Sequence, residues 1–428
     1  MKKILSLLLA VVMIIGVTTF VNPVSAKAEE HEPVTITYMR QEARDPGAEQ
    51  AIIEKFEQEY PWITVEIINT PAGDTYKKFL LADQAGEPID VAWTFWTAGA
   101  AGNGLCADLS SFVTEEYLSQ FSEAMLGIGM FEGKLYAIPW RAGGDIYLAN
   151  VDVLEATGLD YKDIQQNGWT WDDFRSYAEQ AREAGDNIYG VGFSGSTADT
   201  GTDWQFWPWL ITAGGSVVKD NGQKAAFNSP EGVKALTFLC DLIKDDLVPP
   251  GVASTGTSVL QELQGADQLG MWQDGPWKLT TVRNSYPDKN FVALPLPSLD
   301  GRIGNISGGT ALCMSAHSKH PEEAWLFLSY LTNPENMLEW CKYLNELSPI
   351  IANWDDPFYQ TDDWQVCVKA LRDSDEIFPT NSYYDNETLN QIMRDYLNAA
   401  YVGDLTPEEA LAGAEEEWNA ILDEYYGG

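Results

Sequence analysis

Strands and helices alternate in the first part of this chain, and that order restricts the fold more than any other feature. The run from Val34 to Met39 alternates polar and apolar residues and is rich in β-branched side chains, which predicts a strand. Apolar residues at helical spacing then extend from Ile52 to Tyr60. A second strand at 63–67, a helix at 74–85 and a third strand at 89–93 follow. This order predicts an α/β fold in which helices cover a parallel sheet.

Ligands of such sheets bind beyond the carboxyl ends of the strands. The first predicted strand ends just before Glu42, whose carboxylate we expect to face a cleft; if the strand ends a residue or two earlier, Arg40 or Gln41 takes that place. Phe95 and Trp96 follow the third strand. They either form an aromatic platform in the cleft or pack in the core.

The remaining chain continues the alternation. Helices are expected at 170–184, 230–245 and from 321 onward, and short strands at 134–139, 145–150, 190–193, 266–273, 291–295 and 311–315. The end of the chain is expected to be mainly helical, apart from an extended insert at 349–384. Polar candidates follow predicted strand ends, where a carboxylate or guanidinium can bond ligand hydroxyls: Arg141, Asp145 and Asp274. Each is otherwise a solvated charge or one half of an ion pair.

An unusually aromatic stretch occupies Asp203 to Gly215. A helix over 203–213 would be apolar on two faces, so one face can pack inside while Trp204, at the helix start, faces a cleft. A flat indole suits the apolar face of a sugar ring, because stacking depends on area and rigidity. The alternative is that all four rings of the stretch are core, as large aromatic residues usually are.

The N-terminus has the pattern of a secretory signal. Two lysines precede an apolar run from Ile4 to Phe20 and a small-residue site that ends at Ala26. We therefore expect residues 1–26 to be removed on export to a periplasm or to the cell exterior. The first cysteine is Cys106, so no lipid-attachment cysteine lies near the predicted cleavage site.

Net charge narrows the range of partners. The formal charge is −38, which argues against nucleic acid and anionic membranes. The five cysteines show no C-x-x-C spacing, which indicates buried small side chains and at most one or two disulfides. His317 and His320 lack further ligands at metal-site spacing, so no metal or other cofactor is predicted.

Catalytic signatures are also missing from the sequence. It contains no G-x-S-x-G, Walker loop or H-E-x-x-H pattern. A secreted glycoside hydrolase or lyase stays open as an alternative, because 64 acidic residues always allow a carboxylate pair to be proposed. A wall-associated lectin module would more often be all-β and repeated.

Taken in order, short motifs along the chain resemble the carbohydrate-binding group of extracellular solute-binding proteins of ABC importers, which includes maltose-binding protein. The matching segments span nearly the whole chain after the signal: 88–91, 133–139, 170–174, 207–215, 270–277, 308–309, 319–328, 331–335 and 406–411. Each motif is loose alone, and their shared order is specific.

The resemblance implies a two-lobe fold of parallel-sheet lobes, joined by a hinge that the chain crosses more than once. The N-terminal lobe would comprise 34–141 and 291–332, and the C-terminal lobe 142–290 and 333–428. The protein would act without catalysis, as a monomer that delivers a carbohydrate to a membrane permease. Two departures are clear: the lipid-anchor cysteine is missing, and Gly143-Gly144 stands where maltose-binding protein has a charged residue.

The resemblance also implies site residues. Trp277, in a Gly-Pro-Trp motif, and Trp204 match sugar-stacking positions. Trp140 and Gly309 lie in matched segments or beside them, and Tyr383 is expected to reach the cleft from the C-terminal part. The number of aromatic residues favours an oligosaccharide over a single enclosed sugar.

Overall fold

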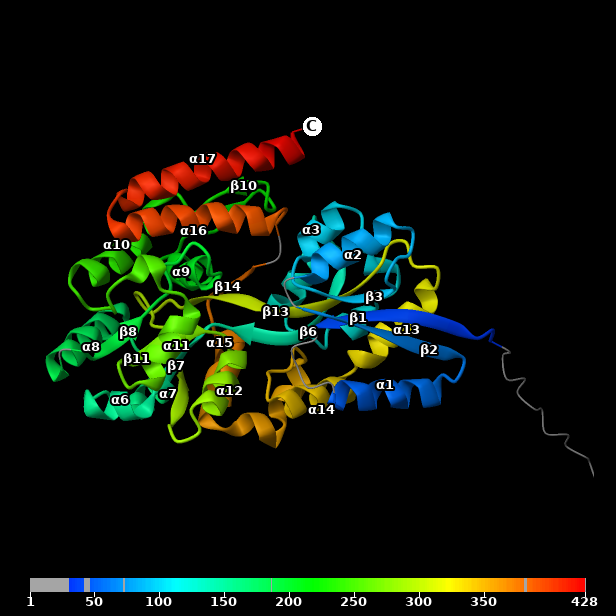
Figure 1. The fold of residues 1–428 in the computed structure, drawn as a ribbon, viewed down its shortest axis with the longest axis horizontal. Helices are drawn as coiled ribbons and strands as arrows, with labels where there is room; N and C mark the ends of the chain where they lie inside the picture. The colour runs from blue at the N-terminus through cyan, green and yellow to red at the C-terminus, as the bar shows by residue number, and fades with distance from the viewer. Residues whose placement is uncertain (1–30, 42–46, 72–73, 186, 381–382, 428) are drawn as a thin grey trace, which may run out of the picture.

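The computed structural model describes residues 31–41, 47–71, 74–185, 187–380 and 383–427. These residues form two α/β lobes that lie side by side, each built on its own sheet (Figure 1). The predicted two-lobe α/β fold is therefore confirmed. Both sheets contain antiparallel as well as parallel pairs, so the expectation of purely parallel sheets is wrong.

The sheet of the first lobe has the strand order β14-β13-β3-β1-β2, and β6 pairs with β13 off this path. Its strands are β1 (Val34–Gln41), β2 (Ile63–Thr70), β3 (Val91–Thr94), β6 (Ala137–Gly144), β13 (Gly304–Met314) and β14 (Glu376–Pro379). β1 is parallel to β2 and β3, as the alternation of strands and helices predicted. β13 runs antiparallel to β3 and β6, which makes the sheet mixed.

The sheet of the second lobe has the order β12-β7-β11-β8. Its strands are β7 (Ile146–Asn150), β8 (Tyr189–Gly192), β11 (Leu269–Asp274) and β12 (Phe291–Leu294). β8 is parallel to β11, whereas β7 is antiparallel to both β11 and β12. Two short hairpins complete the strands: β4 (Met130–Phe131) with β5 (Lys134–Leu135), and β9 (Val218–Lys219) with β10 (Lys224–Ala225).

Helices of the first lobe enclose its sheet. They are α1 (Gly47–Glu59), α2 (Thr75–Gln84), α3 (Thr97–Gly102), α4 (Glu115–Leu118), α5 (Glu123–Leu126), α13 (Pro321–Leu331) and α14 (Pro334–Leu344). α1, α13 and α14 pack together in a core where Phe56 meets Phe327 edge to face, with ring centroids 5.1 Å apart. Short 3₁₀ turns occupy Leu109–Ser111, Gly127–Gly129, Val252–Ser254, Ile351–Asp355 and Pro357–Gln360.

Helices of the second lobe form the larger cluster on the left of Figure 1. They are α6 (Val151–Ala156), α7 (Tyr161–Asn167), α8 (Trp171–Ala184), α9 (Gly201–Thr212), α10 (Pro230–Lys244), α11 (Thr257–Gly265), α12 (Pro276–Ser285), α16 (Asn386–Val402) and α17 (Pro407–Tyr426). The aromatic stretch is α9. Its Phe206, Trp207 and Trp209 are buried in the core, whereas Trp204 is only partly buried.

Three crossings between the lobes can be followed from the described elements. It passes from β6 to β7 through Asp145, from β12 to β13 through 295–303, and again from β14 to α16. Helix α15 (Asp362–Arg372) packs against β6 and β12, and so against both sheets. The crossing strands β6 and β13 are buried along their whole length.

Two expected lobe assignments are wrong. β12 pairs with β7 in the second sheet, although 291–332 was assigned to the first lobe. α14 packs on α1, and β14 pairs with β13 in the first sheet, although 333–428 was assigned to the second lobe. The insert at 349–384 is also not extended throughout, because α15 lies within it. These features depend on long-range pairing, which local residue patterns do not reveal.

All five cysteines are free thiols in the structure, and only Cys240 is not fully buried. Within the part of the chain that the structure describes, none of the helices is long and apolar enough to cross a membrane. The predicted signal at 1–26 lies outside the described residues.

Candidate functional site

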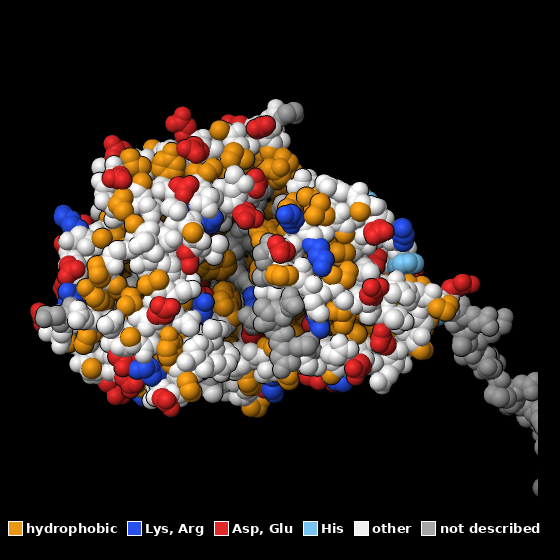
Figure 2. Space-filling view, in the orientation of Figure 1, with side chains coloured by type: hydrophobic (Ala, Val, Ile, Leu, Met, Phe, Trp, Pro, Cys, Tyr) orange, Lys and Arg blue, Asp and Glu red, His pale blue; other side chains and the backbone are white. Residues whose placement is uncertain are grey.

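A cavity of about 420 Å³ lies between the two lobes, and Figure 2 shows the hollow where they meet. Its wall on the first-lobe side comprises Phe95, Trp96, Arg141 and Gly309. The second lobe contributes the start of α9, the end of β11, the start of α12 and one face of α16. A cavity of this size is within the range of small-ligand sites in proteins.

Aromatic rings stand on both sides of this cavity. Trp204 and Trp277 of the second lobe are nearly perpendicular, at 74°, with ring centroids 6.2 Å apart. Phe95 and Trp96 of the first lobe make a similar pair, at 68° and 5.6 Å. Trp277 is the second residue of α12, where Pro276 fixes the helix start. The cavity therefore offers flat apolar surfaces in more than one orientation.

Glycines beneath the two indoles allow their close approach to the crossing strands. Gly143 of β6 and Gly308 of β13 are register partners. A Cβ atom on Gly143 would lie 2.4 Å from Trp277 Cζ3, and one on Gly308 would lie 2.2 Å from Trp204 Cη2. No side chain larger than hydrogen fits at either position without moving a ring. The Arg141 guanidinium also lies over the Trp277 ring, 5.2 Å from its centroid, which is cation–π geometry.

The buried side chain of Asp145 fixes the Trp204 indole through a hydrogen bond. Trp204 Nε1 donates to Asp145 Oδ1 and Gln273 Nε2 donates to Asp145 Oδ2, each at 2.6 Å. The backbone amide of Asp145 donates to Asn305 Oδ1 at 2.9 Å, which ties the residue to β13. Asp145 is fully buried and, among the described residues, forms no ion pair. Burial in this setting raises the pKa of Asp145 to about 8.

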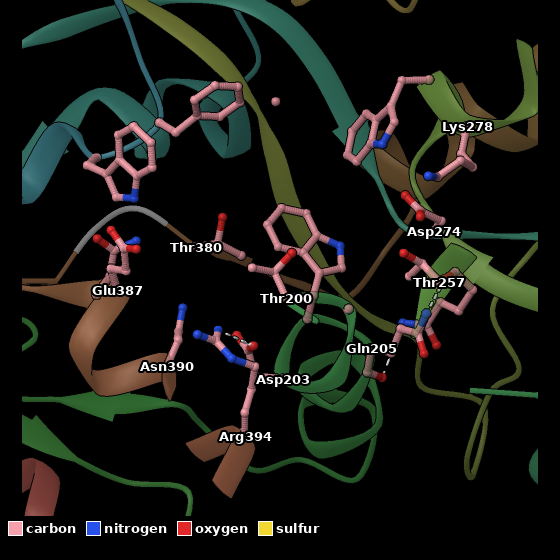
Figure 3. A pocket seen from close by; sticks show the side chains of 18 of the residues that line it. Thr200, Asp203, Gln205, Thr257, Asp274, Lys278, Thr380, Glu387, Asn390 and Arg394 are labelled. Carbon is pink, nitrogen blue, oxygen red and sulfur yellow. Dashed lines mark hydrogen bonds and ion pairs between the residues drawn. The ribbon is translucent and has the colours of Figure 1, made fainter. Parts of the chain in front are cut away.

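A buried ion pair lies in the second-lobe wall. Arg394 of α16 donates to Asp203 of α9 at 2.9 Å, and both side chains are at least nine-tenths buried. Burial raises the pKa of Asp203 to about 6, although the charge of Arg394 acts in the opposite direction. Asn386, Asn390 and Arg394 recur every four residues, so they lie on one face of α16. Figure 3 shows Arg394 bonded to Asp203, with Asn390 beside it on α16.

Asp274 and Lys278 stand together at the other side of the pocket from Glu387 (Figure 3). Asp274 ends β11, and the backbone amide of Gly275 donates to its Oδ1 at 2.7 Å. Burial raises the pKa of Asp274 to about 6, and the charge of Lys278 partly offsets that rise. The Asp274 carboxylate can therefore accept bonds from a neutral, hydroxyl-rich ligand.

Each cationic side chain of the cavity wall is matched by a carboxylate. Arg141 Nε lies 3.2 Å from Glu346 Oε2, with both side chains buried. Arg394 binds Asp203, and Lys278 faces Asp274. An anionic solute would find no excess positive charge in the described wall, so the electrostatics favour an uncharged ligand.

Seven of the predicted site residues line the cavity: Phe95, Trp96, Arg141, Trp204, Asp274, Trp277 and Gly309. Asp145 lies behind the wall rather than in it. Trp140 is fully buried against Trp340, with ring centroids 4.2 Å apart, because neighbouring residues of a strand face opposite sides and Arg141 faces the cavity. Tyr383 packs in the core against Trp418 and donates its hydroxyl to Asn390 Oδ1 at 2.6 Å. Glu42 lies outside the described residues.

Several wall residues were missed in the sequence. They are polar residues of α9, α11, β11, α12 and α16: Thr200, Asp203, Gln205, Thr257, Gln273, Lys278, Asn386, Glu387, Asn390 and Arg394, together with Gly201 and Thr380. The wall residues Asn386, Asn390 and Arg394 of α16 could have been found in the sequence, since polar residues at a spacing of four interrupt an otherwise amphipathic helix. The described residues contain no group of three or more His, Cys, Asp or Glu side chains placed to hold a metal ion.

Comparison with known sequences gives a family match. The family model of the bacterial extracellular solute-binding protein matches residues 41–338. A binding protein of Brucella abortus is 24% identical over 322 residues, which are 74% of this chain and 76% of that protein. The arabinooligosaccharide-binding protein of Bacillus subtilis is 26% identical over 302 residues, which are 66% of each chain.

Comparison with solved structures agrees on the fold. The crystal structure of the cyclic alpha-maltosyl-1,6-maltose binding protein of Arthrobacter globiformis matches with a TM-score of 0.79. The match has 23% sequence identity and covers 92% of this chain and 100% of that one. At 23% sequence identity the similarity shows a shared fold and does not identify the ligand.

Proposed function

Because this chain belongs to the bacterial extracellular solute-binding proteins, we propose that it is the carbohydrate receptor of an ABC importer. It binds a neutral oligosaccharide between its lobes and presents it to the permease in the membrane. The protein acts outside the cytoplasm as a single copy, and it binds the sugar without cleaving it. Two relatives, the arabinooligosaccharide-binding protein of Bacillus subtilis and the multiple sugar-binding protein of Streptococcus mutans, support this ligand class.

The observation that carries the proposal is the arrangement of indoles in the interlobe cavity. Sugar rings present apolar C–H faces that stack on flat aromatic surfaces. The perpendicular pair of Trp204 and Trp277 supplies two such surfaces, and Trp96 supplies a third from the other lobe. A ligand that meets all three must contain more than one ring. This is why an oligosaccharide fits better than a monosaccharide.

The polar part of the wall suits sugar hydroxyls. The cavity wall contains both amide and carboxylate groups, and its two arginines are already paired with carboxylates. Hydroxyl groups that leave water need both donors and acceptors in return. The carboxylate of an amino acid or of an anionic solute would instead require an arginine that has no carboxylate partner.

Closure follows from the division of the wall between the lobes. Arg141 and Trp96 belong to the first lobe, whereas Trp204 and Trp277 belong to the second. A ligand that contacts both sets gains more contacts in the closed arrangement than in an open one. This difference in binding free energy shifts the population toward the closed form that a permease can recognise.

Hydrolysis of a bound sugar is the alternative function for such a cavity. A glycosidase needs two carboxyl groups that flank one bond. Asp203 is occupied by Arg394, and Asp145 by Trp204 and Gln273. The carboxylates of Asp274 and Glu387 come from opposite sides of the pocket (Figure 3). Because Asp203 and Asp145 are held by protein partners, neither is free to act as the acid or base of a hydrolase, which favours binding without turnover.

Titration calorimetry with neutral oligosaccharides, amino acids and peptides tests the proposal. We expect saturable binding of at least one oligosaccharide and thermal stabilisation of about 2.7 kcal/mol at a hundredfold excess over Kd. Trp277→Ala should weaken binding at least about tenfold, or ~1.4 kcal/mol. Trp325→Ala is the matched control, because Trp325 is another partly buried indole, packed on Phe112 and Tyr117 of the first lobe.

Three results would contradict the proposal. Binding of amino acids or peptides in place of sugars would refute the ligand class. Chromatography of the recovered sugar is the second readout, and the appearance of shorter products would indicate an enzyme. Equal affinities for wild type and Trp277→Ala would remove the stacking argument.

A further inference from the structure

A second, smaller cavity of about 140 Å³ adjoins the interlobe cavity at the Glu387 end. Its wall comprises Tyr76 of α2, Gly99 and Asn103 around α3, and the segment from Tyr384 to Glu387 at the start of α16. It therefore also lies between the lobes, since α2 and α3 belong to the first and α16 to the second.

The two cavities share part of their walls. Trp96, Asn386 and Glu387 line both. In Figure 3, Glu387 lies on α16 at one end of the pocket, opposite Asp274 and Lys278. A ligand chain that lies along the large cavity from the Asp274 end thus reaches the small cavity beside Trp96 and Glu387.

The chemistry of the small cavity resembles that of the large one. Tyr76 and Trp96 form a tilted aromatic pair with ring centroids 6.0 Å apart. Asn103 Nδ2 donates to the Tyr76 hydroxyl at 3.0 Å, so this hydroxyl keeps its own proton for a further acceptor. Asp385 and Glu387 add carboxylate oxygens, which accept bonds from hydroxyl groups. Flat rings together with acceptors are the features that suit a sugar.

The aromatic wall on the α16 side is fixed in place. Tyr384 stacks face to face on Tyr425 of α17, with ring centroids 3.6 Å apart and planes at 10°. A Cβ atom on Gly102 of α3 would lie 3.0 Å from the Tyr425 hydroxyl and 3.1 Å from the Tyr384 ring. The stacked pair therefore rests on the first lobe, and it loses little conformational entropy when a ligand binds.

The volume is appropriate for one ring. A protein cavity of about 150 Å³ holds a six-membered carbon ring, and the small cavity measures about 140 Å³. We propose that it is a subsite for one further sugar ring of an oligosaccharide whose other rings lie in the large cavity. The inference rests on the proposed function and extends it to ligand length: the preferred ligand is longer than the large cavity alone can hold.

Gly99 provides a direct way to block this subsite. It lies within α3 and lines the small cavity but not the large one. A Cβ atom added there meets no atom within 4 Å, so a larger side chain extends into open space without displacing backbone. Gly99→Leu should fill the cavity. Gly99→Ala makes the same backbone change with a single methyl group, and it is the matched control.

The experiment measures affinity for homologous maltooligosaccharides and arabinooligosaccharides that differ by one unit at a time. For wild type and Gly99→Ala we expect a step of about tenfold or more in Kd when the chain becomes long enough to enter the small cavity. For Gly99→Leu the step should disappear, while affinity for the shorter chains stays within about twofold of wild type. Thermal unfolding of the three proteins confirms that each is folded.

The outcomes separate this inference from the proposed function. If Gly99→Leu keeps the wild-type step, or if wild type shows no step although it binds sugars, the subsite is wrong and the receptor function stands. If wild type binds none of the sugars at any length, the proposed function itself fails. Loss of affinity for short and long chains alike in Gly99→Leu would place the leucine in the large cavity and would also overturn the subsite.

Discussion

Replacing Asp145 with asparagine should change how the stability of the protein depends on pH. Asp145 is fully buried at the first crossing between the lobes. Its two carboxylate oxygens accept bonds from Trp204 and Gln273. Because burial opposes the charged form, the pKa of this carboxyl rises from 3.8 to about 8.

The sign of the effect follows from that rise. Below a pH of about 3.8 the carboxyl is protonated in both the folded and the unfolded state, and its contribution to stability is fully present. Between the two pKa values the folded state keeps a proton that the unfolded state has lost. Stability is then lost as the pH rises toward 8, by about 1.4 kcal/mol per pH unit for one group. From about pH 5 to 7 the wild type should therefore lose up to ~2.7 kcal/mol through Asp145.

Asp145→Asn removes this titration but also one hydrogen bond. The amide replaces one accepting oxygen with an NH2 donor, which then faces the N–H of Trp204 or of Gln273, and this costs about 1–3 kcal/mol. The variant should therefore be less stable than wild type near pH 5, and the difference should narrow or reverse near pH 7. Asp203 and Asp274 titrate in both proteins, so the difference between the two curves isolates Asp145.

Urea unfolding at a series of pH values, followed by circular dichroism, measures both curves. Asp404→Asn is the control, because Asp404 is an exposed aspartate that does not line the cavity. Its curve should run parallel to that of wild type. A parallel curve for Asp145→Asn would refute the reasoning, since it would show that the buried carboxyl does not take up a proton on folding in this range.

Three further predictions concern packing and ion pairs. Arg394→Met should lower the free energy of unfolding by about 3 kcal/mol, because it leaves Asp203 buried without its cation. Adding Asp203→Asn should restore part of this loss, as measured by urea unfolding. If stability does not recover in the double variant, the pairing is contradicted. Gly143→Ala should weaken sugar binding by about tenfold, since its Cβ displaces the Trp277 ring; calorimetry measures this, and wild-type affinity would show that the ring adjusts at no cost. Thr170→Ala should cost about 1 kcal/mol through loss of the capping box of α8, with sugar affinity unchanged.

Local patterns in the sequence predicted the elements of the fold well but not their allocation to lobes. The alternation up to Trp93 predicted β1 to β3 and a parallel sheet, whereas the strand order β3-β1-β2 is known only from the structure. β12 illustrates the limit. Its four residues read as a strand, yet nothing local indicates that they pair with β7 rather than with the first sheet. Assignment of a short strand to a sheet depends on contacts with residues far away in the chain.

The same distinction applies to the site. Trp204 was a candidate because it lies near a predicted helix start, and Trp277 because its Gly-Pro-Trp motif resembles a stacking position of the family. Trp140 and Tyr383 could not be separated from them by residue type, since burial decides their role. The role of Arg394 could not be predicted from the sequence, because its partner Asp203 lies on another helix.

The structure also explains why the cavity and the crossings coincide. Both indoles of the second lobe rest on Gly143 and Gly308, which are paired on the two crossing strands. Asp145 lies two residues after Gly143 at the same crossing, and its carboxylate accepts a hydrogen bond from the Trp204 indole. A sugar that stacks on these rings is therefore in contact with side chains supported by the crossing strands themselves. If the lobes rotate about those strands, as the proposed function requires, the space above the indoles changes and ligand stacking is coupled to closure.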